Sequence, residues 1–248
     1  MATLLMPLPA ADFDPTESAV PWQVLTARGH RIVFATPDGR AGQADPRMVD
    51  GRGLGPWKPL LQADARARAA HAAMIDSDAF RRPLRHAEID ASRFDGLILP
   101  GGHAPGMRAY LESAELQRCV AAMFERRVPI GAICHGVVLA ARSTRADGRS
   151  VLHGLRTTAL TRTLELSGWA LTALWLGRYY RTYPVTVQGE VSAALARSED
   201  FIVGPPALRR DSPQHHERGF TVRDGHYLSA RWPGDAHRFA DEFGKMLG

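Results

Sequence analysis

The residue best suited to nucleophilic chemistry is Cys134, which ends the apolar run 128–133 and is followed at once by His135 and Gly136. This pattern predicts a buried strand that turns sharply into a helix, with the cysteine at the turn. Such an elbow needs small residues two positions before and after the nucleophile, and Ala132 and Gly136 occupy those positions. Because the helix N-terminus favours an anion, we expect the thiol to be partly ionised near neutral pH.

The alternative is that Cys134 is a small buried core residue, which is a common role for cysteine. The other cysteine, Cys119, lies within a predicted helix and is expected to be structural. Two cysteines cannot form a disulfide framework, and their spacing is not that of a metal site. This cysteine usage predicts a reducing compartment and a cytoplasmic protein.

Two further groups of residues could take part in catalysis. Gly101 and Gly102 follow an apolar strand and precede His103, and paired glycines let backbone N–H groups approach a small ligand closely. Glu17 stands in the first turn of a predicted helix. Both have a plainer explanation, since the glycines could form only a turn and the carboxylate could favour the positive end of its helix.

The composition argues against several other classes of function. The net charge is +5, but the basic residues are scattered among acidic ones and are not interleaved with aromatic residues, so we expect no nucleic-acid binding. The run 215–217 contains two histidines and a glutamate without the spacing of a helical zinc site, and no metal is predicted. Residues 1–11 are apolar but lack a basic start, which favours a first strand over a signal peptide or membrane span.

The order of elements predicts the fold class. Strands are expected at 3–8, 31–36, 95–99 and 128–134, and helices at 16–25, 61–74, 76–82, 113–126 and 135–142. This β-α-β alternation indicates an α/β protein with a doubly wound, mostly parallel sheet and helices on both faces. We expect a single domain over residues 1–248, in which the insertion 37–86 is a candidate lid above the strand ends.

The last third of the chain is less regular. A short strand is expected within 151–158, a helix at 161–176, and an aromatic segment at 176–184 that contacts either a lid or a second subunit. Residues 204–218 form a predicted loop. The pair Asp224 and Gly225 predicts a tight hairpin turn, and residues 234–247 a closing helix.

Three motifs in this order resemble those of the ThiJ/PfpI superfamily, the class I glutamine amidotransferase-like proteins that include glyoxalase III, protein deglycases and chaperone-type members. The motifs are Asp14-Pro15-Thr16-Glu17, Leu99-Pro100-Gly101-Gly102-His103 and Ala132-Ile133-Cys134-His135-Gly136. Their order and spacing cover the chain to about residue 142. The resemblance implies a flavodoxin-like fold, no cofactor, and a homodimer or other homo-oligomer.

The resemblance also implies roles for individual residues. Cys134 matches the nucleophile, His135 matches the histidine that follows it, and Glu17 matches the acid that approaches the thiol. Gly101 and Gly102 match the loop whose N–H groups stabilise an oxyanion. We expect Glu17 to stay protonated, because burial and a nearby negative charge both raise the pKa of a carboxyl group.

Two assignments remain more open. His103 either contacts substrate or lines the pocket. In the glyoxalase and chaperone branch an acid about thirty residues beyond the cysteine orients the histidine, and Glu165 lies 31 residues beyond Cys134. Glu165 is therefore the predicted third member of a catalytic triad.

The resemblance, together with these residues, implies a cofactor-independent enzyme that acts on small reactive 2-oxoaldehydes, as glyoxalase III does when it converts methylglyoxal to lactate, or an allied deglycase. One alternative is a stress-related holdase chaperone or redox sensor, in which Cys134 oxidises and the aromatic segment contacts clients. The other is a cysteine peptidase or amide hydrolase. The expected partners are an aldehyde substrate and a second copy of the chain, with neither nucleic acid nor membrane.

Overall fold

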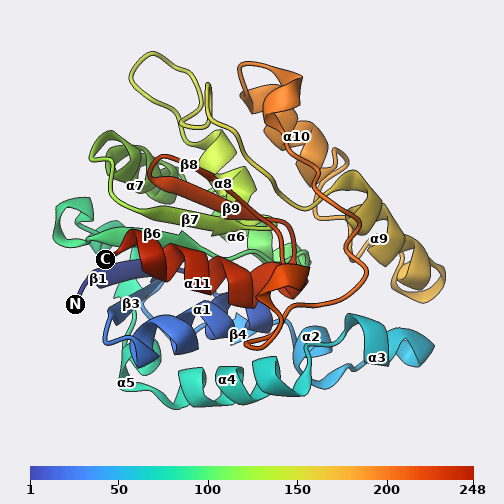
Figure 1. Ribbon diagram of the computed structural model, residues 1–248. Coiled ribbons are helices and arrows are strands. Elements are labelled where there is room, and N and C mark those ends of the chain that lie inside the picture. Colours follow the sequence, from blue (N-terminus) through green and yellow to red (C-terminus); the bar gives the residue numbers. More distant parts are fainter.

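Seven strands form the central sheet of the computed structural model, which describes residues 1–248 (Figure 1). In spatial order they are β5 (Leu84–Arg85), β3 (Arg31–Thr36), β1 (Thr3–Pro7), β6 (Gly96–Leu99), β7 (Ile130–Ile133), β9 (Tyr227–Ala230) and β8 (Thr221–Asp224). All neighbours are parallel except β8, which runs antiparallel to β9. Strands β6 and β7 are buried along their whole length, as parallel strands covered on both faces must be. The predicted flavodoxin-like, doubly wound fold is confirmed.

Helices cover both faces of this sheet (Figure 1). Helices α1 (Pro15–Ala27) and α11 (Ala236–Met246) lie on one face, and α7 (Ala114–Glu125) and α8 (Gly136–Arg142) lie on the other. Close packing of α11 depends on Gly131 in β7, because a Cβ atom there would lie 2.7 Å from the ring of Phe239. Helix α4 (Ala65–Asp76) packs against the outer side of α1, and α5 (Asp78–Arg81) packs against β3.

A second set of elements gathers near the carboxyl ends of the strands (Figure 1). It comprises β2 (Ala11–Phe13), β4 (Gln43–Ala44), α2 (Pro46–Asp50), α3 (Lys58–Leu61), α6 (Arg108–Leu111), α9 (Arg162–Leu176) and α10 (Val187–Ala194). Strands β2 and β4 form a separate two-stranded sheet, and α10 packs against α8. The chain passes outward from β1 to β3 and β5 and then returns to β6 and β7, so the strand order reverses between β1 and β6. In open α/β sheets, ligands bind at the carboxyl ends beside such a reversal.

Several predicted elements differ from the observed ones. The strand expected within 151–158 is wrong: this stretch forms turns, and only an isolated bridge joins Thr157 to Phe201. The predicted helix 61–74 is divided, because Asp64 caps a new helix by accepting a hydrogen bond from the Ala67 N–H. Helix α10 and the short strands β2, β4 and β5 were not predicted. The hairpin is confirmed, with Gly225 at φ +57° between β8 and β9.

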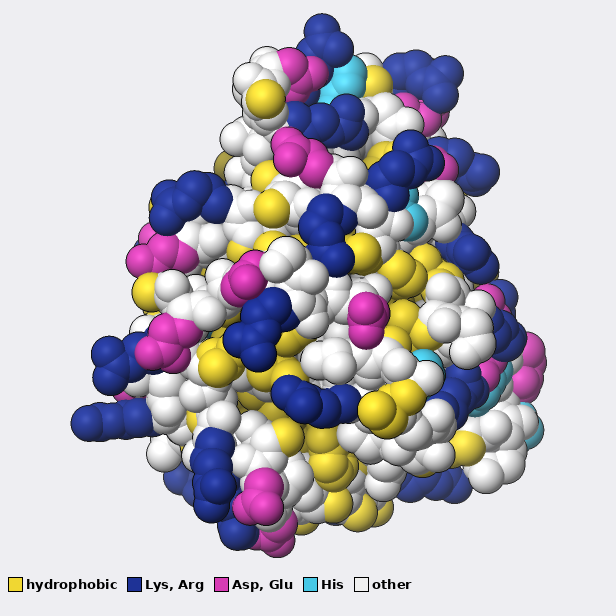
Figure 2. All heavy atoms as spheres, turned by 90° about the vertical axis from the view of Figure 1, so that its left-hand side faces the viewer, with side chains coloured by type: hydrophobic (Ala, Val, Ile, Leu, Met, Phe, Trp, Pro, Cys, Tyr) yellow, Lys and Arg dark blue, Asp and Glu magenta, His cyan; other side chains and the backbone are white.

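No helix in the structure has both the length and the apolar character that crossing a membrane requires. Figure 2 shows the side of the molecule at which both termini lie, where basic side chains are scattered and acidic ones stand among them. This face carries no continuous basic surface.

Candidate active site

Cys134 occupies a sharp turn between β7 and α8. Its φ is +57°, a left-handed conformation that is uncommon for a residue with a side chain. The turn is held by the sheet, since the Cys134 N–H donates to the Ala230 carbonyl of β9 at 3.1 Å. It also requires glycine at position 136, where a Cβ atom would lie 2.0 Å from the Leu99 carbonyl oxygen. The predicted elbow is thus confirmed, with a strained backbone at its tip.

Glu17 is brought toward the elbow by the start of α1. The Asp14 carboxylate caps this helix by accepting hydrogen bonds from the N–H groups of Thr16 at 2.7 Å and Glu17 at 3.0 Å. The Asp14 N–H in turn donates to the Gly101 carbonyl at 2.9 Å. The Gly101 N–H donates to Oε2 of Glu17 at 2.8 Å, which fixes the side chain against the loop after β6. A side chain at position 101 would block this approach, because its Cβ would lie 2.7 Å from Oε2.

The Glu17 carboxyl is fully buried, and the other carboxyl oxygen, Oε1, has no conventional hydrogen-bond partner. Burial and, secondarily, the charge of Asp14 hold the pKa of Glu17 well above its usual range. The carboxyl also lies close enough to the Cys134 thiol for the two groups to shift each other's pKa. This raised pKa favours the protonated Glu17 carboxyl, whose proton can be donated to the sulfur or to a bound ligand.

The ionisation state of Cys134 differs from the expected one. Cys134 is only 3% exposed, and burial, followed by the nearby acidic groups Glu17 and Asp14, raises the pKa of the thiol well above its usual range. The His135 N–H favours the thiolate through a hydrogen bond, but this effect is smaller. The resting sulfur is thus a thiol, because desolvation outweighs the helix N-terminus.

His135 stands between the thiol and Thr182. Its Nδ1 lies 3.5 Å from the Cys134 sulfur, and its Nε2 lies 3.2 Å from Oγ1 of Thr182. That hydroxyl donates its only hydrogen to the His103 carbonyl at 2.7 Å, so it must accept from Nε2–H. The unprotonated Nδ1 consequently faces the thiol. Burial, the largest cause, lowers the pKa of His135 to about 3, which keeps the ring neutral.

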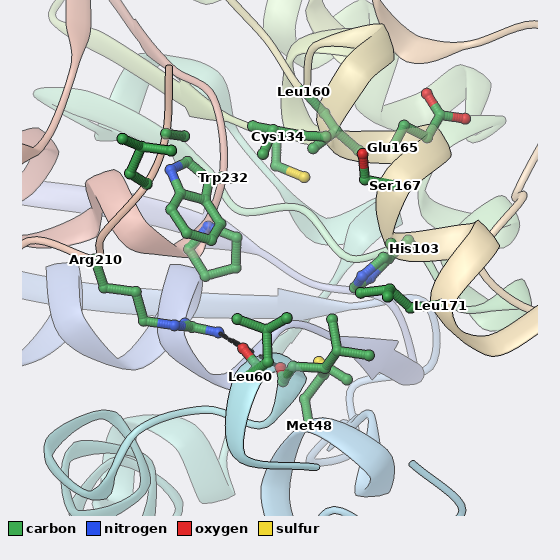
Figure 3. A pocket seen from close by; sticks show the side chains of 16 residues that line it. Met48, Leu60, His103, Cys134, Leu160, Glu165, Ser167, Leu171, Arg210 and Trp232 are labelled. Atoms are coloured by element: carbon green, nitrogen blue, oxygen red, sulfur yellow. Dashed lines mark hydrogen bonds between the residues drawn. The ribbon is translucent and has the colours of Figure 1, made fainter. Parts of the chain in front are cut away.

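The expectation that Glu165 orients His135 is not met. Its Oε2 accepts from the Val187 N–H at 2.8 Å, and its Oε1 lies 3.3 Å from Nε of Arg181. Figure 3 shows the Glu165 carboxylate pointing away from the Cys134 sulfur. Thr182 takes the place expected for the acid, and no signal in the sequence distinguished this threonine from others.

The two glycines contribute differently from what the resemblance implied. The Gly101 N–H is already bound to Glu17 and is not free to hold an oxyanion. The Gly102 N–H donates no hydrogen bond within the chain. Gly102 has φ +154°, and a Cβ atom there would lie 2.7 Å from the Asp12 carbonyl, so this close backbone contact requires glycine.

A cavity of about 230 Å³ reaches Cys134 (Figure 3). It is lined by Met48, Leu60, Leu61, His103, Cys134, Leu160, Leu164, Glu165, Ser167, Gly168, Leu171, Ala207, Leu208, Arg210, Trp232 and Pro233. The predicted insertion 37–86 supplies Met48, Leu60 and Leu61 to its wall, whereas α4 of the same insertion packs on α1 instead. No group of three or more His, Cys, Asp or Glu side chains is arranged to hold a metal ion.

The aromatic segment 176–184 lies against this region. The Tyr179 hydroxyl donates to Oδ1 of Asp45 in the insertion at 2.9 Å. The ring of Tyr180, which is 3% exposed, lies 4.5 Å from that of His103. Of the two predicted roles, the structure favours the contact with the insertion. His103 itself lines the cavity, and burial lowers its pKa to about 4.

The fold and the elbow define a class: flavodoxin-like α/β proteins with a cysteine at a strand-to-helix turn. Residues 8–205 match the family model described as ThiJ/PfpI family-like, and the chain belongs to this family. The resemblance found in the three motifs is thereby confirmed.

Individual relatives are distant. The chain is 28% identical over 135 residues to a DJ-1 homolog D from Arabidopsis thaliana, a match that covers 54% of this chain and 30% of that protein. It is 28% identical over 164 residues to a deglycase from Thermococcus kodakarensis, covering 66% and 69% of the two chains. Glyoxalase III from Candida albicans superimposes with a TM-score of 0.72 at 17% identity, over 100% of this chain and 98% of that one. This structural likeness shows a shared fold.

Proposed function

We propose that the protein is a cofactor-independent cysteine enzyme that converts 2-oxoaldehydes to 2-hydroxy acids, with methylglyoxal to lactate as the simplest case. The observation that carries this proposal is the position of the Cys134 thiol, with the free Nδ1 of His135 3.5 Å away and the protonated Glu17 carboxyl beside it. The named activities of a glyoxalase III and a deglycase among the similar proteins support it.

The first step is addition of the thiol to the aldehyde. The sulfur forms a bond to the aldehyde carbon while its proton passes to Nδ1 of His135, so no free thiolate has to form in the buried site. The aldehyde oxygen becomes an alkoxide that receives a proton from Glu17 and a hydrogen bond from the Gly102 N–H. The product is a hemithioacetal on Cys134.

The second step moves hydrogen between adjacent carbons. The Glu17 carboxylate removes the proton from the former aldehyde carbon, and the protonated His135 returns its proton to the neighbouring ketone oxygen to give an enediol. Glu17 then returns the proton to the second carbon while His135 accepts the hydroxyl proton of the former aldehyde carbon, which produces a 2-hydroxy thioester. One carbon is oxidised and its neighbour is reduced within the same molecule, so no external oxidant or reductant is required. Water then cleaves the thioester and restores the thiol.

A client-binding role receives no comparable support. It required the aromatic segment to be a contact surface, but Tyr180 is buried against His103 and Tyr179 is bound to Asp45. A peptidase would use the same Cys134 and His135, so only assays with different substrates can distinguish a peptidase from the proposed enzyme.

The test is turnover of methylglyoxal by purified protein without glutathione, with lactate as the measured product. Fluorogenic peptides and simple amides are assayed in parallel, and heat-denatured protein is the control. The proposal expects lactate and no peptide or amide cleavage. Amide cleavage without lactate would replace it with the hydrolase alternative, and inactivity toward every aldehyde tested would remove it.

A further inference from the structure

The wall of the cavity beyond Cys134 is mostly apolar. Helix α9 presents Leu164, Ser167, Gly168 and Leu171 to it, a spacing that places all four on one face of the helix. The opposite wall is formed by residues of α2, α3 and the 205–210 segment, including Met48, Leu60 and Leu208. The polar side chains in the lining are those of His103, Glu165, Ser167 and Arg210.

This space is large for the smallest 2-oxoaldehyde. About 10–15 Å³ of such volume is enough for one water molecule, so a cavity of about 230 Å³ far exceeds a minimal site. Methylglyoxal has a single methyl group, which would leave most of the apolar wall uncovered. Ligand pockets usually match an apolar wall with an apolar part of the ligand.

The rim of the cavity is apolar as well. Leu60 is 58% exposed and Leu208 is 87% exposed, although both line the cavity. The rim is fixed by Arg210, whose Nη2 lies 3.5, 3.5 and 3.3 Å from the carbonyl oxygens of residues 60, 61 and 62. Figure 3 shows this guanidinium directed at Leu60. Apolar side chains held at an open rim favour entry of an apolar group.

We propose that the ligand of this site carries an apolar arm larger than methyl, an alkyl chain or an aryl ring, that lies along the inner face of α9. If the ligand is the substrate of the proposed reaction, on which this assignment depends, the substrate class is the alkyl- and arylglyoxals. The reactive carbonyls lie at Cys134, and the arm contacts Leu164, Gly168 and Leu171.

Gly168 offers a variant that fills the cavity without strain. A Cβ atom at this position meets no heavy atom within 4 Å, and leucine is a better helix former than glycine. Gly168→Leu should therefore shorten the space for an arm while the protein stays folded. Ala170→Leu is the matched control, because Ala170 is an exposed residue of the same helix and is absent from the cavity lining.

The first measurement is calorimetric binding of two reaction products, lactate and 2-hydroxyoctanoate, to the unmodified protein and both variants. A buried methylene group is worth roughly fourfold in affinity, and the longer acid has about five more, so we expect at least a thirtyfold preference for it. Gly168→Leu should reduce this preference to less than about a third of its value, and Ala170→Leu should keep it. Equal affinity for the two acids, or a preference unchanged by Gly168→Leu, would overturn the proposal.

The second measurement is turnover, and it separates this inference from the proposed function. We expect a higher kcat/KM for 2-oxooctanal than for methylglyoxal, and Gly168→Leu should lower the ratio of the two kcat/KM values, whereas Ala170→Leu should keep it. If neither aldehyde reacts while 2-hydroxyoctanoate still binds preferentially, the proposed function fails and the apolar-arm site stands. If methylglyoxal reacts at least as well as 2-oxooctanal and both acids bind equally, the function stands and the inference fails.

Discussion

Thr182 Oγ1 lies 3.2 Å from Nε2 of His135 and donates its own hydrogen to the His103 carbonyl, 2.7 Å away. One hydroxyl therefore fixes the imidazole with its free nitrogen toward the thiol. Removing it in Thr182→Val should lower kcat about tenfold, because the ring loses its preferred tautomer and orientation. Thr182→Ser keeps the hydroxyl and should recover most of the rate.

Steady-state kinetics of both variants measure this effect. A purely structural role for Thr182 would lower the thermal midpoint of both variants in parallel with their activity. If the serine variant is no better than the valine variant, Thr182 does not position His135.

Glu17 is expected to act as an acid and base, which an amide cannot replace. Glu17→Gln keeps an oxygen for the Gly101 N–H and adds no charge to a buried site, so the free energy of unfolding should change by no more than about 1 kcal/mol. We expect kcat to fall by about 10²–10⁴. Chemical denaturation and turnover assays test the two expectations separately, and a fully active glutamine variant would exclude the assigned role.

The buried His135 makes stability depend on pH. Its pKa is about 3 in the folded protein and near 6.5 in an unfolded chain, so the unfolded state binds more protons between these values. The contribution of the neutral ring to the free energy of unfolding is fully present above about pH 6.5 and is lost as the pH falls toward 3. Between pH 7 and pH 5 this histidine should cost about 2 kcal/mol of unfolding free energy.

Urea denaturation at the two pH values measures this loss. In His135→Gln, the decrease in unfolding free energy between pH 7 and pH 5 should be smaller by about 2 kcal/mol. The control for removing a histidine elsewhere in the chain is His215→Asn at the exposed surface. An identical decrease in wild type and His135→Gln would mean that the ring is already solvated or charged in the folded protein.

The elbow itself depends on Gly136. Because a Cβ atom there would lie 2.0 Å from the Leu99 carbonyl oxygen, Gly136→Ala must displace backbone and should cost at least about 3 kcal/mol of stability. Gly168→Ala is the control, since its added Cβ meets no neighbour and alanine favours the helix by up to about 1 kcal/mol. Thermal unfolding compares the two, and a Gly136→Ala variant as stable as wild type would contradict the close approach.

The parts of the site predicted from sequence are those set by local sterics. Cys134 at the elbow follows from an apolar strand that ends beside Ala132 and Gly136, and parallel strands bring their carboxyl ends together. The resemblance implied that Glu17 approaches the thiol, but the hydrogen bond from the Gly101 N–H that holds its carboxyl was not predicted.

The other parts depend on long-range packing. Glu165 has the spacing of a triad acid, but Arg181 and the Val187 N–H compete for its carboxylate, and sequence spacing cannot show this. Thr182 reaches His135 only because the segment after α9 folds back over His103. The raised pKa of Cys134 reflects burial by many elements, whereas the sequence showed only the helix N-terminus.

The central claim is that Cys134 attacks the substrate, and the two cysteines of the chain provide the most direct measurement. Cys134→Ala and Cys119→Ala make the same change at two buried sites, only one of which lines the cavity. We predict that lactate formation from methylglyoxal without glutathione falls by at least about a thousandfold in Cys134→Ala and is largely retained in Cys119→Ala. Comparable lactate formation by Cys134→Ala and wild type would contradict the account.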